Sequence, residues 1–470
     1  MPIHFGTDGW RAIVGEAFTQ ERVAQLIQSF CELKKKFKEV PIVLGYDRRF
    51  ASDRFANTVA EVLLGNGFSV KLSQSFCPTP VISWLTKEKK ALAGIVVTAS
   101  HNPYYYNGIK FKEPDGGAAS PQYTQEIEER FAKLEKKAFK IKSLSLEEGK
   151  KLGRLQYFDP QSAYLKRLKS LVDFKAIEKI PGSILVDSMH GAGSGFLKSL
   201  LGKKIIEFRE EENPSFGGVH PEPIAKNLSK TAQQVLQHQA LMALATDGDA
   251  DRIGALDEKG LFVDSHQIFS LILRHLVEVK SWKGTVVKSV TTTERIRKMA
   301  KYYGLDFVET PVGFKHICQA MRQAKKPLIG GEESGGISVA KHVLERDGVF
   351  SGLMLLEILA TQKKPLSKMI KDLDQQFGPH YFERLDLNLK EDKKKSLLQA
   401  LKKGLKPSVK GRRLEGNNFS DGYKYYYDDG SWLMLRASGT EPLLRVYAES
   451  ESPQKTRLLL KTAELLLKKF

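Results

Sequence analysis

Two hydrophobic periods alternate along the chain up to about residue 377. Short runs rich in β-branched residues predict buried strands, whereas apolar residues three and four positions apart predict amphipathic helices. A first unit is expected to contain strands at 42–44, 68–72 and 94–97 and helices at 52–65 and around 81–85. Ser52 is expected to cap the first of these helices. The unit therefore has a β-α-β-α-β order.

The same order recurs in two further stretches of the chain. The second unit is expected to have strands at 184–186, near 205 and at 241–245, with helices ending at 201 and covering 232–239. The third is expected to have strands at 285–290, 306–309 and 327–330, with helices at 293–303 and 314–324. Three units of similar order indicate an internal structural triplication, in which each unit is a sheet flanked by helices.

The pattern changes after about residue 378. Strands are expected at 382–389, 423–427, 432–435 and 444–448, with a lysine-rich helix after the first strand and a last helix from about 453. Strands with helices segregated beside them predict a smaller α+β domain. We therefore expect an α/β protein with three similar α/β domains and a C-terminal α+β domain, divided at 1–150, 151–256, 257–374 and 375–470.

Composition narrows the class of protein. The chain has 470 residues, of which 41% are hydrophobic and 27% charged, values typical of globular proteins large enough for several domains. No apolar run approaches the length of a membrane helix, and the N-terminus lacks the charged and apolar regions of a signal peptide. The cysteines, Cys31, Cys77 and Cys318, are scattered without metal-site spacing. We expect a cytoplasmic protein with no disulfide framework and no zinc site.

The formal net charge of +19 favours an anionic ligand. Such a surplus attracts nucleic acid, anionic membranes or small phosphorylated molecules. The lysine clusters lie far apart and are not interleaved with the aromatic residues on which bases stack. Most of them are therefore expected to be solvated helix faces, and nucleic-acid binding remains a minor alternative.

The predicted strand at 94–97 leads directly into Thr-Ala-Ser-His-Asn-Pro. It delivers Ser100 to a loop that Asn-Pro ends, with His101 adjacent and Lys110 and Lys112 soon after. Ser100 is therefore a candidate covalent nucleophile. Taken alone, it is better explained as a turn serine that bonds its own loop. A hydrolase with His101 as the base is a further alternative, but the G-x-S-x-G elbow is absent, and adjacent residues rarely give nucleophile and base good geometry.

Three aspartates, Asp247, Asp249 and Asp251, follow the predicted strand at 241–245. Residues two apart in an extended segment face the same side, so their carboxylates are expected to converge. Hard oxygen ligands suit Mg²⁺. The spacing also fits part of a calcium-binding EF-hand loop, but Arg252 stands where that loop requires glycine. The pattern therefore predicts a magnesium site.

Three more loops carry groups suited to phosphosugars. The glycine-rich loop 330–336 presents carboxylates and a hydroxyl that can bind sugar hydroxyls. The segment 436–442, with Arg445 beyond it, combines guanidinium groups, hydroxyls and a glycine able to form an anion-binding nest. A glycine-punctuated N-terminal loop ends on Arg11, which can grip a phosphate. In isolation, the glycine-rich loop and the N-terminal loop are better explained as ordinary turns, and the segment 436–442 is equally consistent with a hairpin loop.

Taken together, these motifs resemble those of the α-D-phosphohexomutase superfamily. T-A-S-H-N-P at 98–103, D-G-D-A-D-R at 247–252, G-E-E-S-G at 331–335 and R-A-S-G-T-E-P at 436–442 occur in that family's order, and the resemblance covers essentially the whole chain. It implies three α/β domains with mixed sheets and a distinct fourth domain around a central cleft. It also implies an isomerase that interconverts hexose 1-phosphate and hexose 6-phosphate through a phosphoserine enzyme and a bisphosphorylated sugar.

The resemblance also implies residue roles. Ser100 would be the phosphorylated residue, and its phosphate would bind Mg²⁺ together with Asp247, Asp249 and Asp251. Lys110 would be a general acid or base, and glucose 1,6-bisphosphate the activator. The remaining implied residues are His101, Arg252 and Arg11 in catalysis; Glu332, Ser334, Gly313 and Phe314 at the sugar; and Arg436, Ser438, Gly439, Thr440, Arg445 and Lys315 at the phosphate.

The preferred sugar is less clear from the motifs. Glu333 resembles glucose-handling members, whereas the glucosamine branch usually carries glutamine there and histidine at position 336. Dual-specificity mannose/glucose members also place histidine at 336, as a proton-transfer group, and this chain has Gly336. His342 or Arg346 could substitute. Glucose is therefore the expected sugar, with mannose, glucosamine and pentose phosphates as alternatives. The expected partner is a phosphorylated sugar, without nucleic acid or membrane, and monomer and dimer both remain open.

Overall fold

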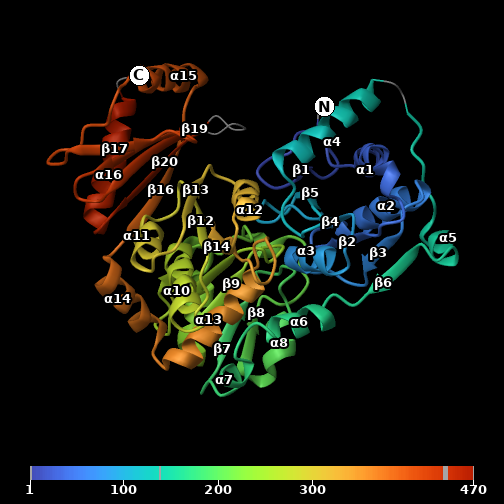
Figure 1. Ribbon diagram of the computed structural model, residues 1–470, viewed down its shortest axis with the longest axis horizontal. Helices are drawn as coiled ribbons and strands as arrows, with labels where there is room; N and C mark the ends of the chain where they lie inside the picture. Colours follow the sequence, from blue (N-terminus) through green and yellow to red (C-terminus); the bar gives the residue numbers. More distant parts are fainter. Residues whose placement is uncertain (1–2, 137–138, 438–442, 469) are drawn as a thin grey trace.

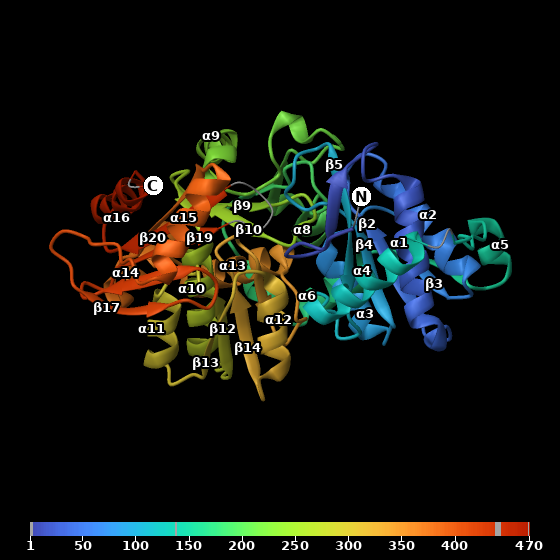
Figure 2. The same cartoon turned by 90° about the horizontal axis from the view of Figure 1, so that it is seen from above.

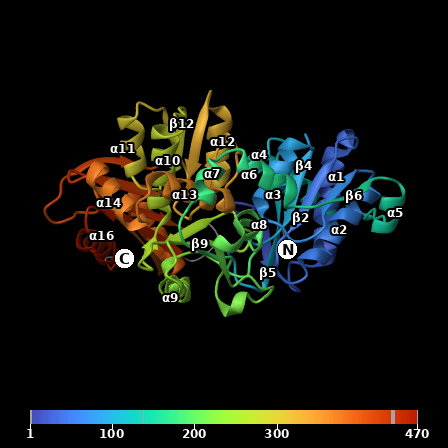
Figure 3. The same cartoon turned by 90° about the horizontal axis from the view of Figure 1, so that it is seen from below.

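A computed structural model describes residues 3–136, 139–437, 443–468 and 470. These residues form four separate sheets, one in each of four domains, which we call domains I to IV. Figure 1 shows domain I in blue on one side and domain IV in red on the other. Views from opposite sides show domains II and III between them (Figures 2 and 3).

Domain I contains a six-stranded mixed sheet in the order β1-β5-β4-β2-β3-β6. Its strands are β1 (Trp10–Ile13), β2 (Ile42–Tyr46), β3 (Val70–Ser73), β4 (Ala93–Val97), β5 (Tyr106–Lys112) and β6 (Leu155–Phe158). Its helices are α1 (Gln20–Lys34), α2 (Ser52–Gly65), α3 (Thr79–Glu88), α4 (Pro121–Glu135) and α5 (Leu146–Lys151). Strand β2 pairs in parallel with β3 and β4, and β5 returns antiparallel to β4.

Domain II has a five-stranded mixed sheet in the order β11-β10-β9-β7-β8. Its strands are β7 (Ile184–Asp187), β8 (Ile205–Phe208), β9 (Ala243–Thr246), β10 (Ile253–Leu256) and β11 (Phe262–Val263). Its helices are α6 (Ser162–Lys169), α7 (Phe174–Glu178), α8 (Phe196–Leu201) and α9 (Ser229–His238). Strand β7 pairs in parallel with β8 and β9, and β10 returns antiparallel to β9.

Domain III repeats the same arrangement in a four-stranded sheet, β13-β12-β14-β15. Its strands are β12 (Thr285–Ser289), β13 (Phe307–Thr310), β14 (Pro327–Gly331) and β15 (Ile337–Val339). Its helices are α10 (Ser265–Glu278), α11 (Arg295–Tyr302), α12 (Phe314–Gln323), α13 (Gly348–Gln362) and α14 (Leu366–Phe377). In each of the three domains a central strand lies between two parallel neighbours, and the second neighbour is followed by an antiparallel return strand. The topology therefore agrees with the triplication expected from the sequence.

Domain IV is built on an all-antiparallel five-stranded sheet, β16-β20-β19-β18-β17. Its strands are β16 (Tyr381–Asn388), β17 (Leu414–Asn418), β18 (Tyr423–Tyr427), β19 (Trp432–Ala437) and β20 (Leu443–Ser450), and its helices are α15 (Glu391–Lys402) and α16 (Pro453–Leu467). The expected fold class, three α/β domains with mixed sheets and a distinct C-terminal domain, is thus confirmed.

One local expectation is wrong. Ser52 is the first residue of α2 and not its cap, because the N-cap is Ala51 in a left-handed conformation with no capping side-chain bond. The Ser52 hydroxyl instead donates to Asp47 (2.8 Å) and accepts from Asn107 (2.9 Å). The Ser52 hydroxyl thus forms hydrogen bonds with Asp47 and Asn107, and it does not cap the backbone of α2.

The apolar cores explain how the domains hold together. One cluster of buried side chains runs through the first three domains and includes Trp84 of α3, Tyr164 of α6 and Phe269 of α10. Burial of apolar surface on this scale holds the packed elements in a fixed arrangement. Domain IV has its own core and meets domain III through a smaller cluster that contains Trp432 and Val290.

Candidate active site

The three predicted functional loops of domains I to III occupy equivalent positions in the repeated fold. Ser100 lies between β4 and β5, the aspartate loop between β9 and β10, and Glu332 between β14 and β15. Each loop therefore connects the third strand of its unit to the antiparallel return strand. The serine and aspartate loops are in direct side-chain contact, and Arg346 links the aspartate loop to Glu332, so the repeat places its three loops around one centre.

Ser100 is fully buried in a left-handed conformation with φ of 52°. A non-glycine residue there is strained by about 1–3 kcal/mol, and such strain gathers at functional sites. Its Oγ donates a hydrogen bond of 2.8 Å to Asp247 Oδ2, whereas His101 Nδ1 lies 3.5 Å away. Burial, together with the charge of Arg252, lowers the pKa of His101 well below its usual value, so its imidazole is neutral. Asp247 is therefore the nearer partner of the predicted nucleophile, Ser100.

The three aspartates form a compact, buried oxygen cluster. One carboxylate oxygen from each of Asp247, Asp249 and Asp251 lies within 4.8 Å of the others. Burial, Asp251 and Asp249 together raise the pKa of Asp247 well above its usual value. Among the described residues, Asp249 Oδ1 and Asp251 Oδ1 have no hydrogen-bond partner. Buried, unpartnered hard oxygens are the donor set that Mg²⁺ accepts, so these residues fit a magnesium ion.

Lys110 reaches this cluster from β5 of domain I. Its Nζ lies 2.7 Å from both Asp249 and Asp251 and 2.9 Å from Asp8. Burial disfavours the ammonium, but the two loop aspartates outweigh it and raise the pKa of Lys110. Burial also disfavours the charged form of Asp8, which by itself would raise the pKa of that carboxyl. The nearby cations Lys110, Lys112 and Arg346 outweigh burial and hold the pKa of Asp8 well below its usual range. The lysine stays charged and neutralises part of the cluster.

Arg346 joins all three domains. It donates to Glu332 of domain III (2.9 Å), Asp251 of domain II (2.6 Å) and Asp8 of domain I. A Cβ atom built on Gly336 would lie 2.1 Å from Arg346 Cδ, so the glycine makes room for the arginine side chain. His342, by contrast, is buried beside Phe350 and bonds Asp347 at 2.9 Å. Of the two residues proposed to replace a histidine at 336, Arg346 lies among the site residues.

The predicted sugar-recognition loop is ordered by its own side chains. Ser334 Oγ donates to Glu332 at 2.6 Å. The neighbouring Glu333 accepts from Thr291 (2.6 Å) and Ser289 (3.1 Å), at the end of β12. The carboxylate of Glu332 is thus held between Ser334 and Arg346.

Arg11 and Arg252 flank the serine loop. Arg11 Nη1 donates to Asn102 Oδ1 at 2.6 Å. The Arg252 guanidinium lies 3.4 Å from Glu222 and 3.9–4.0 Å from Asp251 and Asp247. Both arginines therefore add positive charge next to Ser100.

Gly313, Phe314 and Lys315 lie at the start of α12, which faces the N-terminal loop. Gly313 is the N-cap of this helix, with φ of 118°. Phe314 is buried under the guanidinium of Arg346, 5.0 Å from the ring centre. Lys315 Nζ donates to Gly6 O at 3.3 Å. These three residues thus border the cluster formed by Asp8 and Arg346.

The predicted phosphate loop is described only in part. Arg436 and Arg445 are cross-strand partners on β19 and β20, and Arg436 pairs with Asp421 at 3.0 Å. Ser438, Gly439 and Thr440 lie outside the described residues. The roles of all these residues remain predictions.

Sequence reasoning missed the pair that holds the serine loop in place. The buried Arg49 donates to the carbonyls of Ser100 (2.6 Å), Asn102 (2.6 Å), Pro103 (2.8 Å) and Tyr106 (3.0 Å). Asp47 accepts from Thr98 and lies 3.4 Å from Arg49. The only signal in the sequence was the pattern Asp-x-Arg directly after the strand at 42–46. This pattern does not indicate a role by itself, because the partners of Arg49 are backbone carbonyls of the serine loop, about 50 residues further along the chain.

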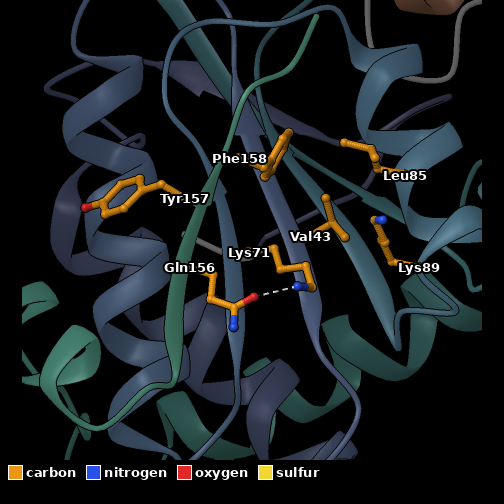
Figure 4. Close-up of a pocket in the computed structure, with 7 residues that line it drawn as sticks. All are labelled: Val43, Lys71, Leu85, Lys89, Gln156, Tyr157 and Phe158. Carbon is orange, nitrogen blue, oxygen red and sulfur yellow. Dashed lines mark hydrogen bonds between the residues drawn. The ribbon is translucent and has the colours of Figure 1, made fainter. Parts of the chain in front are cut away.

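A surface pocket lies apart from this centre. It is a hollow of about 80 Å³ beside β3 and β6, where Lys71 bonds Gln156 at 2.7 Å (Figure 4). Its lining contains none of the predicted site residues: Val43, Lys71, Leu85, Lys89, Gln156, Tyr157 and Phe158. It is smaller than an ordinary small-molecule site of about 300–1,000 Å³.

Comparisons with known proteins agree with this fold. The chain matches the phosphoglucomutase/phosphomannomutase alpha/beta/alpha domains I, II and III over residues 2–138, 162–260 and 264–377, and the C-terminal domain of that family over 387–464. It is 32% identical over 469 residues to a phosphoglucomutase/phosphomannomutase of Thermococcus kodakarensis, covering 98% of both chains. It is 30% identical over 467 residues to a phosphoglucosamine mutase of Carboxydothermus hydrogenoformans, covering 96% of both.

A solved structure is also similar over the full length. A protein of Thermus thermophilus, provisionally named a phosphomannomutase, superposes with a TM-score of 0.86 and 33% identity, covering 100% of this chain and 99% of the other. Among the helices that the structure describes, none combines the length and apolar character that a membrane span requires.

Proposed function

The chain belongs to the phosphoglucomutase/phosphomannomutase family and is a phosphohexomutase, and on this premise we propose that it interconverts glucose 1-phosphate and glucose 6-phosphate through a phosphoserine at Ser100. The observation that carries the proposal is the meeting of three loops from three domains. Ser100 Oγ of domain I bonds Asp247 of domain II, and Arg346 of domain III connects the aspartate loop to Glu332.

The proposed reaction has two balanced half-reactions. Phosphorylated Ser100 transfers its phosphoryl group to the 6-hydroxyl of glucose 1-phosphate: the serine O–P bond breaks and a sugar O–P bond forms. The hydroxyl proton passes to a base, and the departing Ser100 Oγ takes up a proton. The resulting glucose 1,6-bisphosphate turns over in the site. Ser100 Oγ then loses its proton and takes the phosphoryl group from the C1 oxygen: that O–P bond breaks and a serine O–P bond forms. The C1 oxygen takes up a proton, which releases glucose 6-phosphate and restores the phosphoenzyme. Glucose 1,6-bisphosphate activates because it phosphorylates free Ser100.

The surrounding residues supply position and charge, which is most of what a phosphoryl-transfer site can provide. Arg49 fixes the backbone that carries Ser100. Lys110, which stays charged, is the proposed general acid. His101, Arg11 and Arg252 are proposed to hold the transferring group. Glu332 and Ser334 are proposed to bind sugar hydroxyls, with Gly313 and Phe314 bordering the sugar and Lys315 and the 436–445 segment holding the other phosphate.

Mg²⁺ is the proposed cofactor. Asp247, Asp249 and Asp251 would hold it, with the Ser100 oxygen beside them. When bound, the ion offsets negative charge on the phosphoryl group being transferred.

Glucose is proposed over the other sugars because Glu333 stands where the glucosamine branch has glutamine, and because Arg346 fills the space above Gly336 where other members place histidine. Arg346 stays charged, since its carboxylate partners outweigh burial and raise its pKa, so it is proposed to orient the sugar and not to move a proton. Glucosamine phosphate is the second candidate, on the 30% identity to a phosphoglucosamine mutase. We further propose a cytoplasmic enzyme whose partner is the phosphosugar.

Phosphorus NMR of the protein with Mg²⁺ and a trace of glucose 1,6-bisphosphate tests this proposal. Glucose, mannose, glucosamine and ribose 1-phosphates are supplied in separate tubes. Fastest conversion of glucose 1-phosphate supports the sugar as well as the mechanism. Fastest conversion of another sugar refutes the choice of glucose alone, and absence of any isomerisation by folded, phosphorylated protein refutes the proposed activity.

A further inference from the structure

A carboxylate of domain IV binds the loop before α12. Asp421 lies in the turn between β17 and β18, and its Oδ2 accepts the backbone N–H of Val312 at 2.8 Å. The same oxygen lies 3.0 Å from Nε of Arg436. A single atom of domain IV thus binds the backbone of domain III and an arginine of the predicted phosphate loop.

The surroundings of Asp421 are positively charged. Lys315 and His316 begin α12, and burial together with the charges of Lys315 and Arg436 lowers the pKa of His316, which Asp421 opposes. A carboxylate repels a phosphate dianion, so its presence among cations weakens simple charge attraction. Charge attraction for a phosphate therefore does not explain why the Asp421 carboxylate lies beside Arg436. Orientation of the Arg436 guanidinium does explain it. The carboxylate lies on the Nε side of the guanidinium, and a guanidinium carries further N–H donors at Nη1 and Nη2 with which to bind a phosphate.

The turn that carries Asp421 is held tightly against β19. Gly422 has φ of 111°, and a Cβ atom there would lie 2.8 Å from Leu435 O and 3.2 Å from Arg436 Cβ. Only glycine allows this approach. The carboxylate is thus fixed relative to Arg436 by the backbone as well as by its ion pair.

The segment 311–315 is contacted from the other side by domain I. Lys315 donates to Gly6 O, and a Cβ atom on Gly313 would lie 3.7 Å from Thr7. Figure 1 shows α12 between the sheet of domain IV and that of domain I. The segment therefore joins the N-terminal loop to domain IV.

We propose that Asp421 is a positioning residue that sets Arg436 in register with the segment 311–315, so that the phosphate held by domain IV and the sugar held by domain III lie at a fixed spacing. The inference rests on the proposed function, because it assigns the phosphate of the same substrate to Arg436. It adds a residue that lies outside all the recognised motifs.

Two variants separate the two contacts of Asp421. Asp421→Asn keeps an oxygen acceptor for the Val312 N–H but removes the charge that holds Arg436, and Asp421→Ala removes both. Asp428→Asn is the matched control, since Asp428 is an exposed acid of the same sheet whose carboxylate accepts a backbone N–H, from Arg413 at 3.1 Å. Thermal midpoints of all variants establish that they are folded.

Binding of glucose 6-phosphate is measured by calorimetry in the Ser100→Ala background, where no phosphoryl transfer occurs. We expect Asp421→Ala to weaken binding about tenfold or more, Asp421→Asn to fall between, and Asp428→Asn to match the parent. In an Arg436→Ala background, Asp421→Ala should weaken binding of glucose 6-phosphate little further, because the two residues act through one contact. In otherwise wild-type protein, KM for glucose 1-phosphate should rise more than kcat falls.

Unchanged or tighter binding in Asp421→Ala, or a loss that adds in full to that of Arg436→Ala, overturns the proposal. These outcomes are independent of turnover. Failure of wild-type protein to isomerise any sugar, with Asp421-dependent binding of glucose 6-phosphate intact, would refute the proposed function and leave the role of Asp421 in place.

Discussion

Arg49 is expected to stabilise the whole unit that presents Ser100, so we consider Arg49→Met first. The guanidinium makes four hydrogen bonds to carbonyls of the serine loop and lies 3.4 Å from buried Asp47. Burial lowers the pKa of Arg49 to about 10, against the opposing pull of Asp47, so the group remains charged at neutral pH. Methionine keeps the apolar stem and removes every donor.

The size of the effect follows from the partners left behind. Hydrogen bonds from a charged donor contribute about 1.5–3 kcal/mol each, but four that share one guanidinium are not additive. Removing one member of a buried ion pair costs about 3–5 kcal/mol, because the remaining charge is uncompensated. We therefore expect Arg49→Met to lose about 3–5 kcal/mol of local stability. Arg48→Met is the control, since half-buried Arg48 donates to a single carbonyl, Glu210 O, and we expect it to lose less than about 1 kcal/mol.

Native-state hydrogen exchange measures this change without assuming a two-state transition of a multidomain chain. The amides of β4 and β5, on either side of the serine loop, report the opening free energy of the unit. The same sample is tested for phosphorylation of Ser100 by glucose 1,6-bisphosphate, which we expect to fall. A loss below about 1 kcal/mol in Arg49→Met, or one equal to that of Arg48→Met, would refute the assignment of Arg49 as the support of the loop.

Three further predictions follow from the site and its surroundings. Gly336→Ala forces Arg346 aside, because the new Cβ would lie 2.1 Å from Arg346 Cδ. We expect kcat/KM of this variant to fall at least about tenfold in a steady-state assay. Gly416→Ala is the control, because a Cβ there has room, and its kcat/KM should be unchanged. Mg²⁺ should raise the thermal midpoint of the wild type and EDTA reverse the rise, whereas Asp249→Asn should show a smaller shift; equal shifts would exclude the aspartate cluster as the site. Burial opposes the charged form of Glu449, but His380 and His266 outweigh it and lower its pKa from 4.5 to about 2, so its contribution to stability is full above pH 4.5 and is lost as the pH falls towards 2. Acid titration followed by circular dichroism should show that Glu449→Gln loses less stability than the wild type between pH 4.5 and pH 2. Parallel titration curves for the two proteins would contradict the lowered pKa of Glu449.

Contiguous features of the chain were predictable from the sequence. The β-branched run at 94–97 and the adjacent Ser100 identify both a strand and a candidate nucleophile, and the spacing of Asp247, Asp249 and Asp251 identifies a candidate metal site. The order of strands and helices was enough to suggest three similar units, which the sheet topology matches.

Features that depend on contacts between distant residues were not predictable. The short return strands β10 and β15 have no distinctive pattern of their own and form by pairing with β9 and β14. Arg49 and Asp8 act through partners from other parts of the chain, and the choice of Arg346 over His342 required the space above Gly336 to be seen. Propensity and periodicity describe local preference, whereas these residues were fixed by tertiary packing.

The central claim is that Ser100 carries the phosphoryl group. Intact and peptide mass spectrometry of protein treated with glucose 1,6-bisphosphate tests it directly, followed by a chase with excess glucose 1-phosphate. We predict one phosphoryl group per chain, located on Ser100, transferred to sugar during the chase and missing from a folded Ser100→Ala variant that has lost mutase activity. A phosphoryl group on another residue, or full mutase turnover by Ser100→Ala, would contradict the account.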